Sequence, residues 1–228
     1  MRGRLSPCRL GIGAAASTAA CVSLPNPEHA EAPMTTRPGQ AGLPRGVVGR
    51  IVGLIMRRHN RPDNLWTLSL LPIADRQHLL EVGFGPGEAI RIAAASNPSC
   101  RIVGVDHSPT VLAAASHLNR ASIEHGRVWL ALGSVDTLPF ADDTFDNAFP
   151  INCIYFWHAP VQGLRELRRV VRHGGRAAIT VRDIARAPYD AFTPDTLARL
   201  MTEAGFSSVA VHRNGVRSHP LVCALATK

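Results

Sequence analysis

From residue 78 onward, the sequence alternates short apolar runs with segments of helical period. Strands that alternate with crossover helices form a parallel, doubly wound sheet, so the chain is expected to have an α/β fold. The last two apolar runs have no helical segment between them, which predicts an antiparallel end to that sheet. The expected strands are 78–82, 101–105, 128–132, 145–151, 176–181, 208–213 and 221–227, and the expected helices are 64–71, 88–96, 108–119, 160–171 and 193–204.

Several of these boundaries carry residues that begin or end helices. Ser108 and Pro109 stand at the N-cap and first-turn positions of one expected helix. Gly205 follows the last expected helix as a C-terminal stop. The pair Gly174-Gly175 is expected to stop the helix over 160–171. The helices should therefore be short and separated by tight turns.

The strongest ligand signal is the turn Glu81-Val82-Gly83-Phe84-Gly85-Pro86-Gly87-Glu88, between an expected strand and an expected helix. Glycine there lets a ligand approach the backbone, and such sheets bind ligands at the carboxyl ends of their strands. Glu88 stands where the dinucleotide fingerprint needs its third glycine, which argues against a nicotinamide-linked dehydrogenase. No Gly-Lys-Ser/Thr follows, so a P-loop is excluded. The ligand therefore need not carry a pyrophosphate.

Asp106 closes the second expected strand, roughly 20 residues beyond the glycine turn. A carboxylate at this position can accept hydrogen bonds from both hydroxyls of a ribose. An aspartate after a strand is also a common helix cap, so Asp106 alone would be weak evidence. Together with the glycine turn, it predicts a nucleoside-binding crevice.

Five motifs in order carry a resemblance to a known family. They are Glu81–Glu88, Gly104–Pro109, Asp136–Phe140, Asp142–Asp146 and Leu164–Gly175. On these motifs, residues 45–228 resemble the class I S-adenosylmethionine-dependent methyltransferases, and most of all the group that includes the ubiquinone/menaquinone-biosynthesis C-methyltransferases. The resemblance implies a Rossmann-like, doubly wound, seven-stranded sheet, mostly parallel with an antiparallel last strand.

The resemblance also implies S-adenosyl-L-methionine as cofactor and gives each matching position a role. The glycine-turn residues would line the methionine and ribose part, Asp106 would hold the ribose hydroxyls, and Asn152 would lie near the transferable methyl. Arg172-His173 replaces the usual Lys-Pro before Gly174-Gly175, a departure in a turn that is structural. The implied cofactor-binding residues are Glu81, Gly83, Phe84, Gly85, Gly87, Asp106, His107, Ser108, Val135, Asp136, Thr137 and Asn152.

Residues 152–158 follow the fourth expected strand, where an acceptor would sit. Tyr155 and His158 are the candidate general bases, needed only if the acceptor must lose a proton. Phe156 and Trp157 could form an apolar wall beside them. The alternative is that the aromatic side chains pack the start of the next helix and His158 caps it. Cys153 has no evident activating partner and is not expected to be a nucleophile.

Residues 1–40 are rich in Ala, Pro, Ser and Gly and show no period. We interpret residues 1–42 as a disordered arm, or as an over-long start with translation beginning at Met34. A secretory signal with cleavage near Ala30-Glu31-Ala32, or a lipid on Cys21, is the alternative. Its apolar stretch Leu10–Ala20 is interrupted by Ser and Thr, which disfavours insertion.

Residues 43–60 place Val, Leu and Ile at three- and four-residue intervals, with four arginines elsewhere. This pattern predicts a basic amphipathic helix. We expect residues 43–72 to form a helical lid on the main domain, 73–228. Peripheral membrane contact, or contact with an acidic substrate, is the alternative for 43–60. A small, apolar acceptor follows as a hypothesis.

Charge and cysteines limit the partners. The net charge is +8, and residues 1–62 hold nine arginines against two glutamates, so the main body is nearly neutral. Nucleic acid is therefore not the expected partner; a small molecule is. The five scattered cysteines form no CxxC pair, which supports neither a disulfide framework nor a metal site and favours the cytoplasm.

A non-catalytic S-adenosylmethionine-binding protein of the same fold is the alternative function. The sequence leaves the acceptor and the oligomeric state open.

Overall fold

The computed structural model describes residues 60–216, 218 and 220–228. The expected arm over 1–42 and nearly all of the expected amphipathic helix over 43–60 lie outside these residues. The first described residues, 60–70, form a helix. Residue 60 lies four residues before the expected helix start at 64, and Pro62 lies within the first turn of the described helix.

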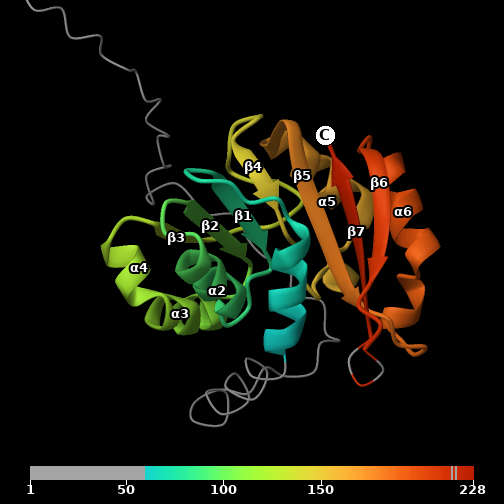
Figure 1. The fold of residues 1–228 in the computed structure, drawn as a ribbon, viewed down its shortest axis with the longest axis horizontal. Coiled ribbons are helices and arrows are strands. Elements are labelled where there is room, and N and C mark those ends of the chain that lie inside the picture. Colours follow the sequence, from blue (N-terminus) through green and yellow to red (C-terminus); the bar gives the residue numbers. More distant parts are fainter. Residues whose placement is uncertain (1–59, 217, 219) are drawn as a thin grey trace, which may run out of the picture. The chain divides into compact units, whose positions relative to one another are not determined.

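The described residues form one seven-stranded sheet with the order β3-β2-β1-β4-β5-β7-β6 (Figure 1). All neighbouring strands are parallel except the pairs that β7 makes with β5 and with β6, which are antiparallel. The predicted Rossmann-like sheet with an antiparallel last strand is thereby confirmed. The strands are β1 His78–Val82, β2 Arg101–Asp106, β3 Val128–Leu132, β4 Phe145–Ala148, β5 Val171–Arg182, β6 Ser207–Arg213 and β7 Leu221–Thr227.

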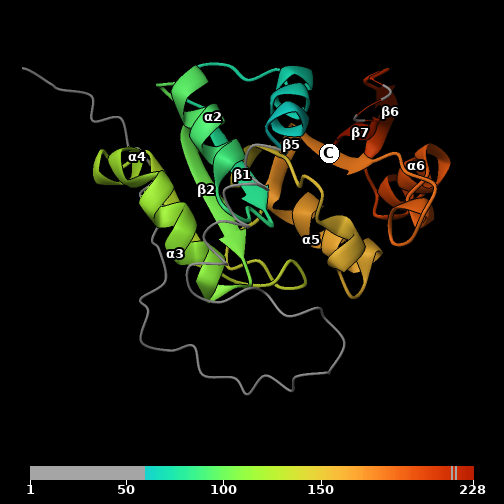
Figure 2. The same ribbon diagram turned by 90° about the horizontal axis from the view of Figure 1, so that it is seen from below.

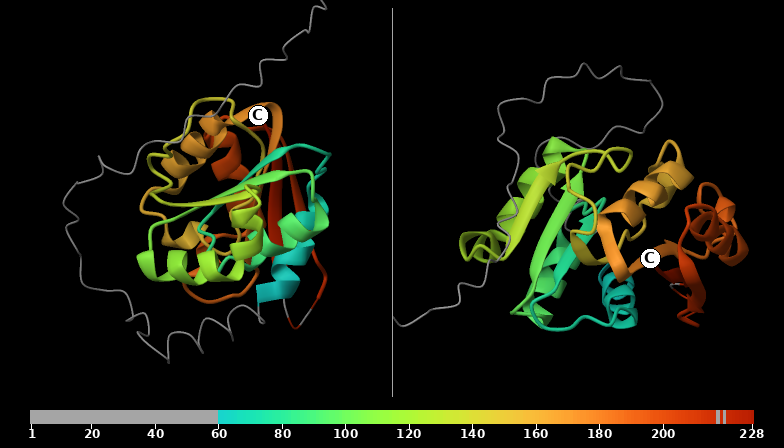
Figure 3. Two further views of the ribbon diagram at one scale, coloured as in Figure 1. Left: turned by 90° about the vertical axis from the view of Figure 1, so that its left-hand side faces the viewer. Right: turned by 90° about the horizontal axis from the view of Figure 1, so that it is seen from above.

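Helices cover both faces of this sheet. The helix over 60–70 and α5 lie on opposite sides of β5 (Figure 2), and the same layering can be followed in Figure 3. The α-helices with printed bounds are α2 Glu88–Ser96, α3 Pro109–Leu118, α4 Arg120–Glu124, α5 Pro160–Val170 and α6 Pro194–Glu203, with short 3-10 turns at Ile154–Phe156 and Tyr189–Ala191. This three-layer arrangement is the one that crossover connections in a parallel sheet require.

The strand residues divide between the two faces with the period of two that a pleated strand imposes. Leu79 packs with Ile90 and Ala93 of α2, whereas its neighbour Leu80 packs with the cluster that includes Leu164 of α5. All of these side chains are fully buried. The strands are therefore apolar on both sides, as expected for a sheet covered by helices on each face.

The helix over 60–70 is attached to the middle of the sheet by a polar contact. The Thr67 hydroxyl donates to the Asp63 carbonyl at 2.9 Å and shares a second hydrogen bond, of 2.8 Å, with the Thr180 hydroxyl of β5. Both threonine side chains are completely buried. Because buried hydroxyls are held by their hydrogen bonds, this pair fixes the height of the helix relative to the carboxyl end of β5.

Several expected boundaries are wrong in detail. The helix expected over 160–171 ends at Val170, and β5 begins at once at Val171 rather than at 176, so Gly174-Gly175 lies within the strand and does not stop the helix. The strand expected over 145–151 ends at Ala148, and Ile151 makes only an isolated bridge to Thr180. Helix α4 was not expected.

Among the residues that the structure describes, no helix is both long and apolar enough to cross a bilayer.

Candidate functional site

The glycine turn leaves the carboxyl end of β1 with three residues in the left-handed region of backbone space. The φ angles of Gly83, Gly85 and Gly87 are 76°, 50° and 79°. The Gly83 N–H donates to the Val105 carbonyl of β2 at 2.7 Å, and the Gly87 N–H donates to the Phe84 carbonyl at 2.9 Å. A residue with a Cβ is strained at positive φ, which accounts for glycine at all three positions.

The three glycines face different surroundings. A Cβ on Gly83 would come within 2.7 Å of Cys153 Cβ, and a Cβ on Gly87 would come within 2.8 Å of Ala115 Cβ on α3. A Cβ on Gly85 would have no atom of the described chain within 4 Å. Gly83 and Gly87 therefore allow close packing, and Gly85 is the one whose backbone is open to a ligand. The Phe84 side chain lies in the core below the turn.

Asp106 connects the turn to the second strand. Its Oδ2 accepts the Gly85 N–H at 2.9 Å, and its Oδ1 accepts the Ser108 N–H at 3.0 Å. The exposed His107 ring lies 3.6 Å from the same carboxylate. Each carboxylate oxygen can accept a second hydrogen bond, so Asp106 can organise the turn and still accept two ligand hydroxyls.

Glu81 is a buried acid directly below the turn. Burial, and secondarily the negative charge of Asp106, raise the pKa of the Glu81 carboxyl well above its usual range. Its Oε2 is buried without a hydrogen-bond partner among the described residues. A buried acceptor in this state favours a ligand that brings a hydrogen-bond donor or a positive charge.

The segment after β3 carries Val135, Asp136 and Thr137. The Asp136 N–H donates to Ser134 Oγ, which in turn donates to Asp136 Oδ2, both at 3.2 Å. Asp136 Oδ1 is buried and finds no partner in the described part of the chain. Val135 is buried in the core, so only its backbone can meet a ligand, while Thr137 is exposed.

Asn152 and Cys153 follow β4 beside the glycine turn. Asn152 has a φ of 53°, and its backbone N–H donates to the Thr180 carbonyl at 2.8 Å. Cys153 is buried, its thiol donates to the Val82 carbonyl at 3.1 Å, and burial raises the pKa of that thiol strongly. A buried thiol of raised pKa is a poor nucleophile, in line with the expectation from sequence.

Tyr155 lies in an aromatic cluster. Its ring meets Phe156, Tyr189 and Phe192 edge to face, at centroid distances of 4.7, 5.0 and 6.3 Å. Burial, with Tyr189 next, raises the pKa of the Tyr155 hydroxyl, so this phenol keeps its proton at neutral pH and is not a general base there. No local pattern in the sequence links Tyr189 to Tyr155, so their ring contact is visible only in the structure.

The sequence offers two interpretations of Trp157 and His158: residues of the acceptor site, or residues that pack and cap the start of the next helix. Trp157 packs against α5, where a Cβ on Gly163 would come within 2.8 Å of its ring. His158 is exposed, and α5 begins at the N-cap residue Ala159 with no side-chain cap, so the interpretation of His158 as a cap is wrong. His158 stays a candidate base.

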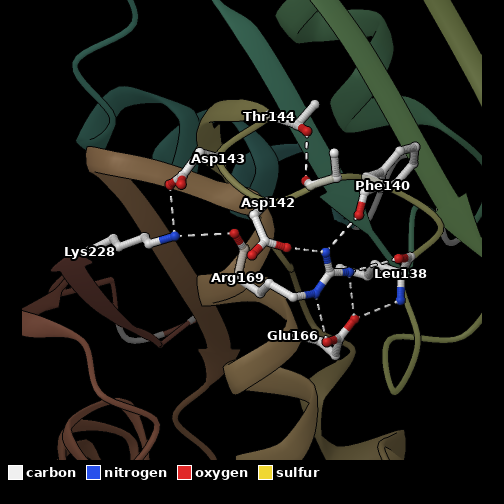
Figure 4. A network of polar contacts seen from close by, with 9 residues as sticks. Leu138, Phe140, Asp142, Asp143, Thr144, Glu166, Arg169 and Lys228 are labelled. Atoms are coloured by element: carbon white, nitrogen blue, oxygen red, sulfur yellow. Dashed lines mark hydrogen bonds and ion pairs between the residues drawn. The ribbon is translucent and has the colours of Figure 1, made fainter. Parts of the chain in front are cut away.

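An arginine network secures the segment that follows Asp136 (Figure 4). Arg169 of α5 makes a two-pronged contact with Glu166, with Nε–Oε1 and Nη2–Oε2 distances of 2.9 Å each. The same guanidinium donates to the Leu138 and Phe140 carbonyls at 2.9 and 2.7 Å and to Asp142 at 2.8 Å. Glu166 also accepts the Leu138 N–H at 3.0 Å. No local pattern in the sequence predicts this network, because Arg169 lies 27 to 31 residues from Leu138, Phe140 and Asp142.

We expect Arg169→Gln to lower the free energy of unfolding by about 2 kcal/mol at neutral pH, because it leaves two carbonyls and a mostly buried carboxylate without their donor. The Arg169 contact lowers the pKa of Glu166. That stabilisation is complete above the unfolded-state pKa of Glu166 and is lost as the pH falls through the lowered folded-state value. The difference in the free energy of unfolding between variant and wild type should therefore be smaller at pH 3 than at pH 7, which urea unfolding at the two pH values would measure.

Arg199→Gln is the control for that experiment. Arg199 forms an exposed pair with Glu203 on α6, so we expect a change of at most about 0.5 kcal/mol at either pH. A gap between wild type and Arg169→Gln that is equal at both pH values would contradict the assigned role of the Arg169–Glu166 pair.

A second polar cluster, also missed from sequence, joins the helix over 60–70 to the ends of β4 and β5. Asp63 Oδ2 accepts from Asn152 Nδ2 at 2.7 Å and from Arg182 at 3.4 Å. Arg182 also donates to Asn60 Oδ1 at 2.8 Å. Asp63 and Arg182 lie 119 residues apart in sequence, and no local pattern marks either of them.

Comparisons with known proteins agree with this geometry. Residues 80–179 match the family model described as a methyltransferase domain. The chain is 28% identical over 182 residues to the uncharacterized methyltransferase YdaC of Bacillus subtilis, covering 78% of this chain and 98% of that protein. It is 38% identical over 105 residues to the ubiquinone/menaquinone biosynthesis C-methyltransferase UbiE of Geobacter sulfurreducens, covering 44% of this chain but only 40% of that protein.

The fold is shared with solved structures. A SAM-dependent methyltransferase from Aquifex aeolicus superposes with a TM-score of 0.62 at 18% identity, covering 72% of this chain and 88% of that one. In this chain the carboxyl edge of that sheet carries a glycine turn preceded by the buried acid Glu81, and a second acid, Asp106, at the end of the next strand. The domain match and these similarities support a class I S-adenosylmethionine-dependent methyltransferase, with S-adenosyl-L-methionine as its cofactor.

The residues at this edge suit that cofactor. S-adenosylmethionine carries donors and positive charge: an ammonium, a sulfonium, two ribose hydroxyls and an adenine amino group. The edge offers buried acceptors that lack partners within the described residues, namely Glu81 Oε2, Asp136 Oδ1 and Asn152 Oδ1. Gly85 adds open backbone beside them. In the described residues, no cluster of three or more His, Cys, Asp or Glu side chains could hold a metal ion.

Proposed function

We propose that this methyltransferase transfers a methyl group to a small, apolar acceptor that enters beside Tyr155 and Phe156. The observation that carries the proposal is Phe156, which is 65% exposed in the 3-10 turn that follows β4. Phe156 contacts Tyr155, which contacts Tyr189 and Phe192, so it is the outer part of a larger aromatic surface. An exposed aromatic ring backed by others is a contact surface for apolar molecules.

Within this proposal the cofactor-binding roles are those that the resemblance implies. Glu81 and the glycine turn hold the methionine and ribose end, Asp106 accepts the ribose hydroxyls, and Asp136 accepts the adenine amino group. The hydrogen bonds and unpartnered acceptors described above support each assignment. His107, Ser108, Val135 and Thr137 flank the adenine, the last two through backbone or exposed atoms.

The bound cofactor supplies a methyl group already activated on sulfur. The protein's task is then to align the acceptor and exclude water, and the aromatic surface suits both. Tyr155, which keeps its proton, can donate a hydrogen bond to an acceptor oxygen. His158 is the side chain that takes a proton if the acceptor must lose one, since imidazole is the commonest general base at neutral pH.

The acceptor class is tested by incubating the protein with S-adenosylmethionine labelled in the methyl group and a fractionated cell extract. We expect the label to enter small molecules that partition into organic solvent. Label found only in protein, nucleic acid or water-soluble products would contradict an apolar acceptor. Label found nowhere, with S-adenosylhomocysteine still bound, would favour a non-catalytic binding protein.

We expect Phe156→Ala to raise the KM for the labelled acceptor about tenfold. A bound apolar acceptor would cover the Phe156 ring, and such an aromatic contact contributes roughly 1–2 kcal/mol. The affinity for S-adenosylhomocysteine should not change, since Phe156 lies on the acceptor side. Val211→Ala is the control, because Val211 is an exposed apolar residue of the edge strand β6. An unchanged KM in Phe156→Ala, measured by steady-state kinetics, would contradict the assignment.

A further inference from the structure

Asp63 is completely buried, although it is an acid in the helix that precedes the sheet. One carboxylate oxygen, Oδ2, takes the Asn152 amide at 2.7 Å and the more distant Arg182 guanidinium at 3.4 Å. The other, Oδ1, is buried and has no hydrogen-bond partner among the described residues. A buried carboxylate oxygen without a donor is costly, so Asp63 Oδ1 is a candidate acceptor for a donor or positive charge of a ligand.

Asn152, which donates to Asp63, also has a buried oxygen without a hydrogen-bond partner among the described residues. A carboxylate can only accept, so the amide must present its Nδ2 to Asp63. That leaves Asn152 Oδ1 at the other branch of the amide, also buried and also without a partner in the described chain. The left-handed backbone of Asn152, with a φ of 53°, is one that asparagine tolerates better than most residues.

The position of these two oxygens follows from Cys153. The Cys153 thiol donates to the Val82 carbonyl at the end of β1, and a Cβ on Gly83 would touch Cys153 Cβ at 2.7 Å. Asn152 is therefore immediately beside the glycine turn. The contact between Thr67 and Thr180 holds Asp63 at the same height, because Thr67 lies one helical turn after Asp63.

We propose that Asp63 is a positioning residue for the cofactor: it orients Asn152 so that the two unpartnered oxygens, Asp63 Oδ1 and Asn152 Oδ1, face the sulfonium-methyl end of S-adenosylmethionine. The proposal rests on the proposed function and on the position near the transferable methyl that the family resemblance implies for Asn152, and it adds a residue from outside the motifs. Arg182 balances the Asp63 charge, so the cluster offers directed acceptors rather than a bare negative charge.

This arrangement distinguishes the cofactor from its product. The sulfonium sulfur of S-adenosylmethionine is positively charged and polarises its methyl group, whereas the thioether sulfur of S-adenosylhomocysteine is neutral. Both molecules carry the same ammonium, ribose and adenine. The affinity ratio of the two ligands therefore reports contacts at the sulfur and not contacts elsewhere, nor a general loss of structure.

The test measures the affinities of the full chain for both ligands by titration calorimetry without any acceptor. Asp63→Asn removes the carboxylate and leaves the Arg182 charge unopposed, so we expect S-adenosylmethionine to bind about tenfold more weakly, while S-adenosylhomocysteine binds within about twofold of wild type. Arg182→Gln leaves the Asp63 charge unopposed. It should therefore strengthen the binding of S-adenosylmethionine relative to S-adenosylhomocysteine. Thermal unfolding confirms that each variant is folded.

Asn152→Gly keeps the test decisive if Asp63→Asn does not fold. Glycine accepts the positive φ and removes only the amide, so S-adenosylmethionine should again lose affinity selectively. Asp195→Asn, an exposed aspartate in the first turn of α6, should leave the ratio unchanged. Equal losses for both ligands in Asp63→Asn, or an unchanged ratio in Asn152→Gly, would overturn the proposal. A wild-type chain that binds neither ligand would instead overturn the proposed cofactor site.

Discussion

Gly83→Ala is expected to destabilise the protein by about 3 kcal/mol or more. The left-handed φ of 76° costs an alanine about 1–2 kcal/mol, and its Cβ would lie 2.7 Å from Cys153 Cβ and 2.9 Å from Cys153 Sγ. The clash is with the root of a side chain that is buried and hydrogen-bonded to Val82, so Cys153 has little room to move. Thermal unfolding of the cofactor-free chain should show a fall of roughly 6–12 °C.

Gly85→Ala is the matched comparison, two residues away in the same turn. Its φ of 50° imposes a similar strain, but the new Cβ would have no described atom within 4 Å. We expect a loss of only about 1–2 kcal/mol in stability, together with a clear loss of affinity for S-adenosylhomocysteine, because the Cβ occupies the open side of the turn. Equal destabilisation by the two substitutions would show that Cys153 does not limit the space at Gly83.

Asp106→Ala is expected to weaken binding of S-adenosylhomocysteine by about 2–4 kcal/mol, or roughly 30- to 1,000-fold. The substitution removes the proposed acceptor of the ribose hydroxyls. It also releases the Gly85 and Ser108 N–H groups that Asp106 now holds at 2.9 and 3.0 Å, so the turn loses its organisation before the ligand arrives. Titration calorimetry with S-adenosylhomocysteine measures the effect without turnover.

Asp146→Ala is the control that distinguishes a loss of ligand binding from a loss of stability in that experiment. Asp146 is as buried as Asp106, at 7% exposure, and it also accepts a backbone N–H, from His78 at 2.7 Å. His78 begins β1, so Asp146 lies at the amino end of the sheet, away from the glycine turn. We expect Asp146→Ala to lower the unfolding temperature and to leave the affinity unchanged. A comparable loss of affinity in both variants would argue against a ligand contact at Asp106.

Much of the fold could be predicted because its determinants are local. The apolar run over 78–82 and the glycines at 83, 85 and 87 fix β1, its turn and the start of α2 within about a dozen residues. Thr193 caps α6 by accepting the Thr196 N–H at 3.2 Å, and Gly205 ends it with a φ of 93°. These signals depend on backbone conformation and short-range hydrogen bonds, which nearby residue types control.

The errors arose where a distant strand overrode a local signal. The prediction that Gly174-Gly175 stops a helix is wrong, because β5 passes through both residues. The Gly175 carbonyl accepts the Lys228 N–H at 3.0 Å, and a Cβ on Gly175 would meet the Asp146 carbonyl at 2.6 Å. The pairing of β5 with the C-terminal strand on one side and β4 on the other decides the conformation there. No residue near 174 carries that information.

The amino-acid sequence by itself determined the layered α/β fold, the acid-flanked glycine turn and the carboxylate after the second strand, because each depends on residues close together in the chain. Only the tertiary structure decided that Asp63 meets Asn152 and Arg182, that Arg169 secures the segment after Asp136, and that Tyr155 joins Tyr189. Those contacts join residues up to 119 positions apart. Their partners are chosen by strand order and helix packing, which no local pattern in the sequence expresses.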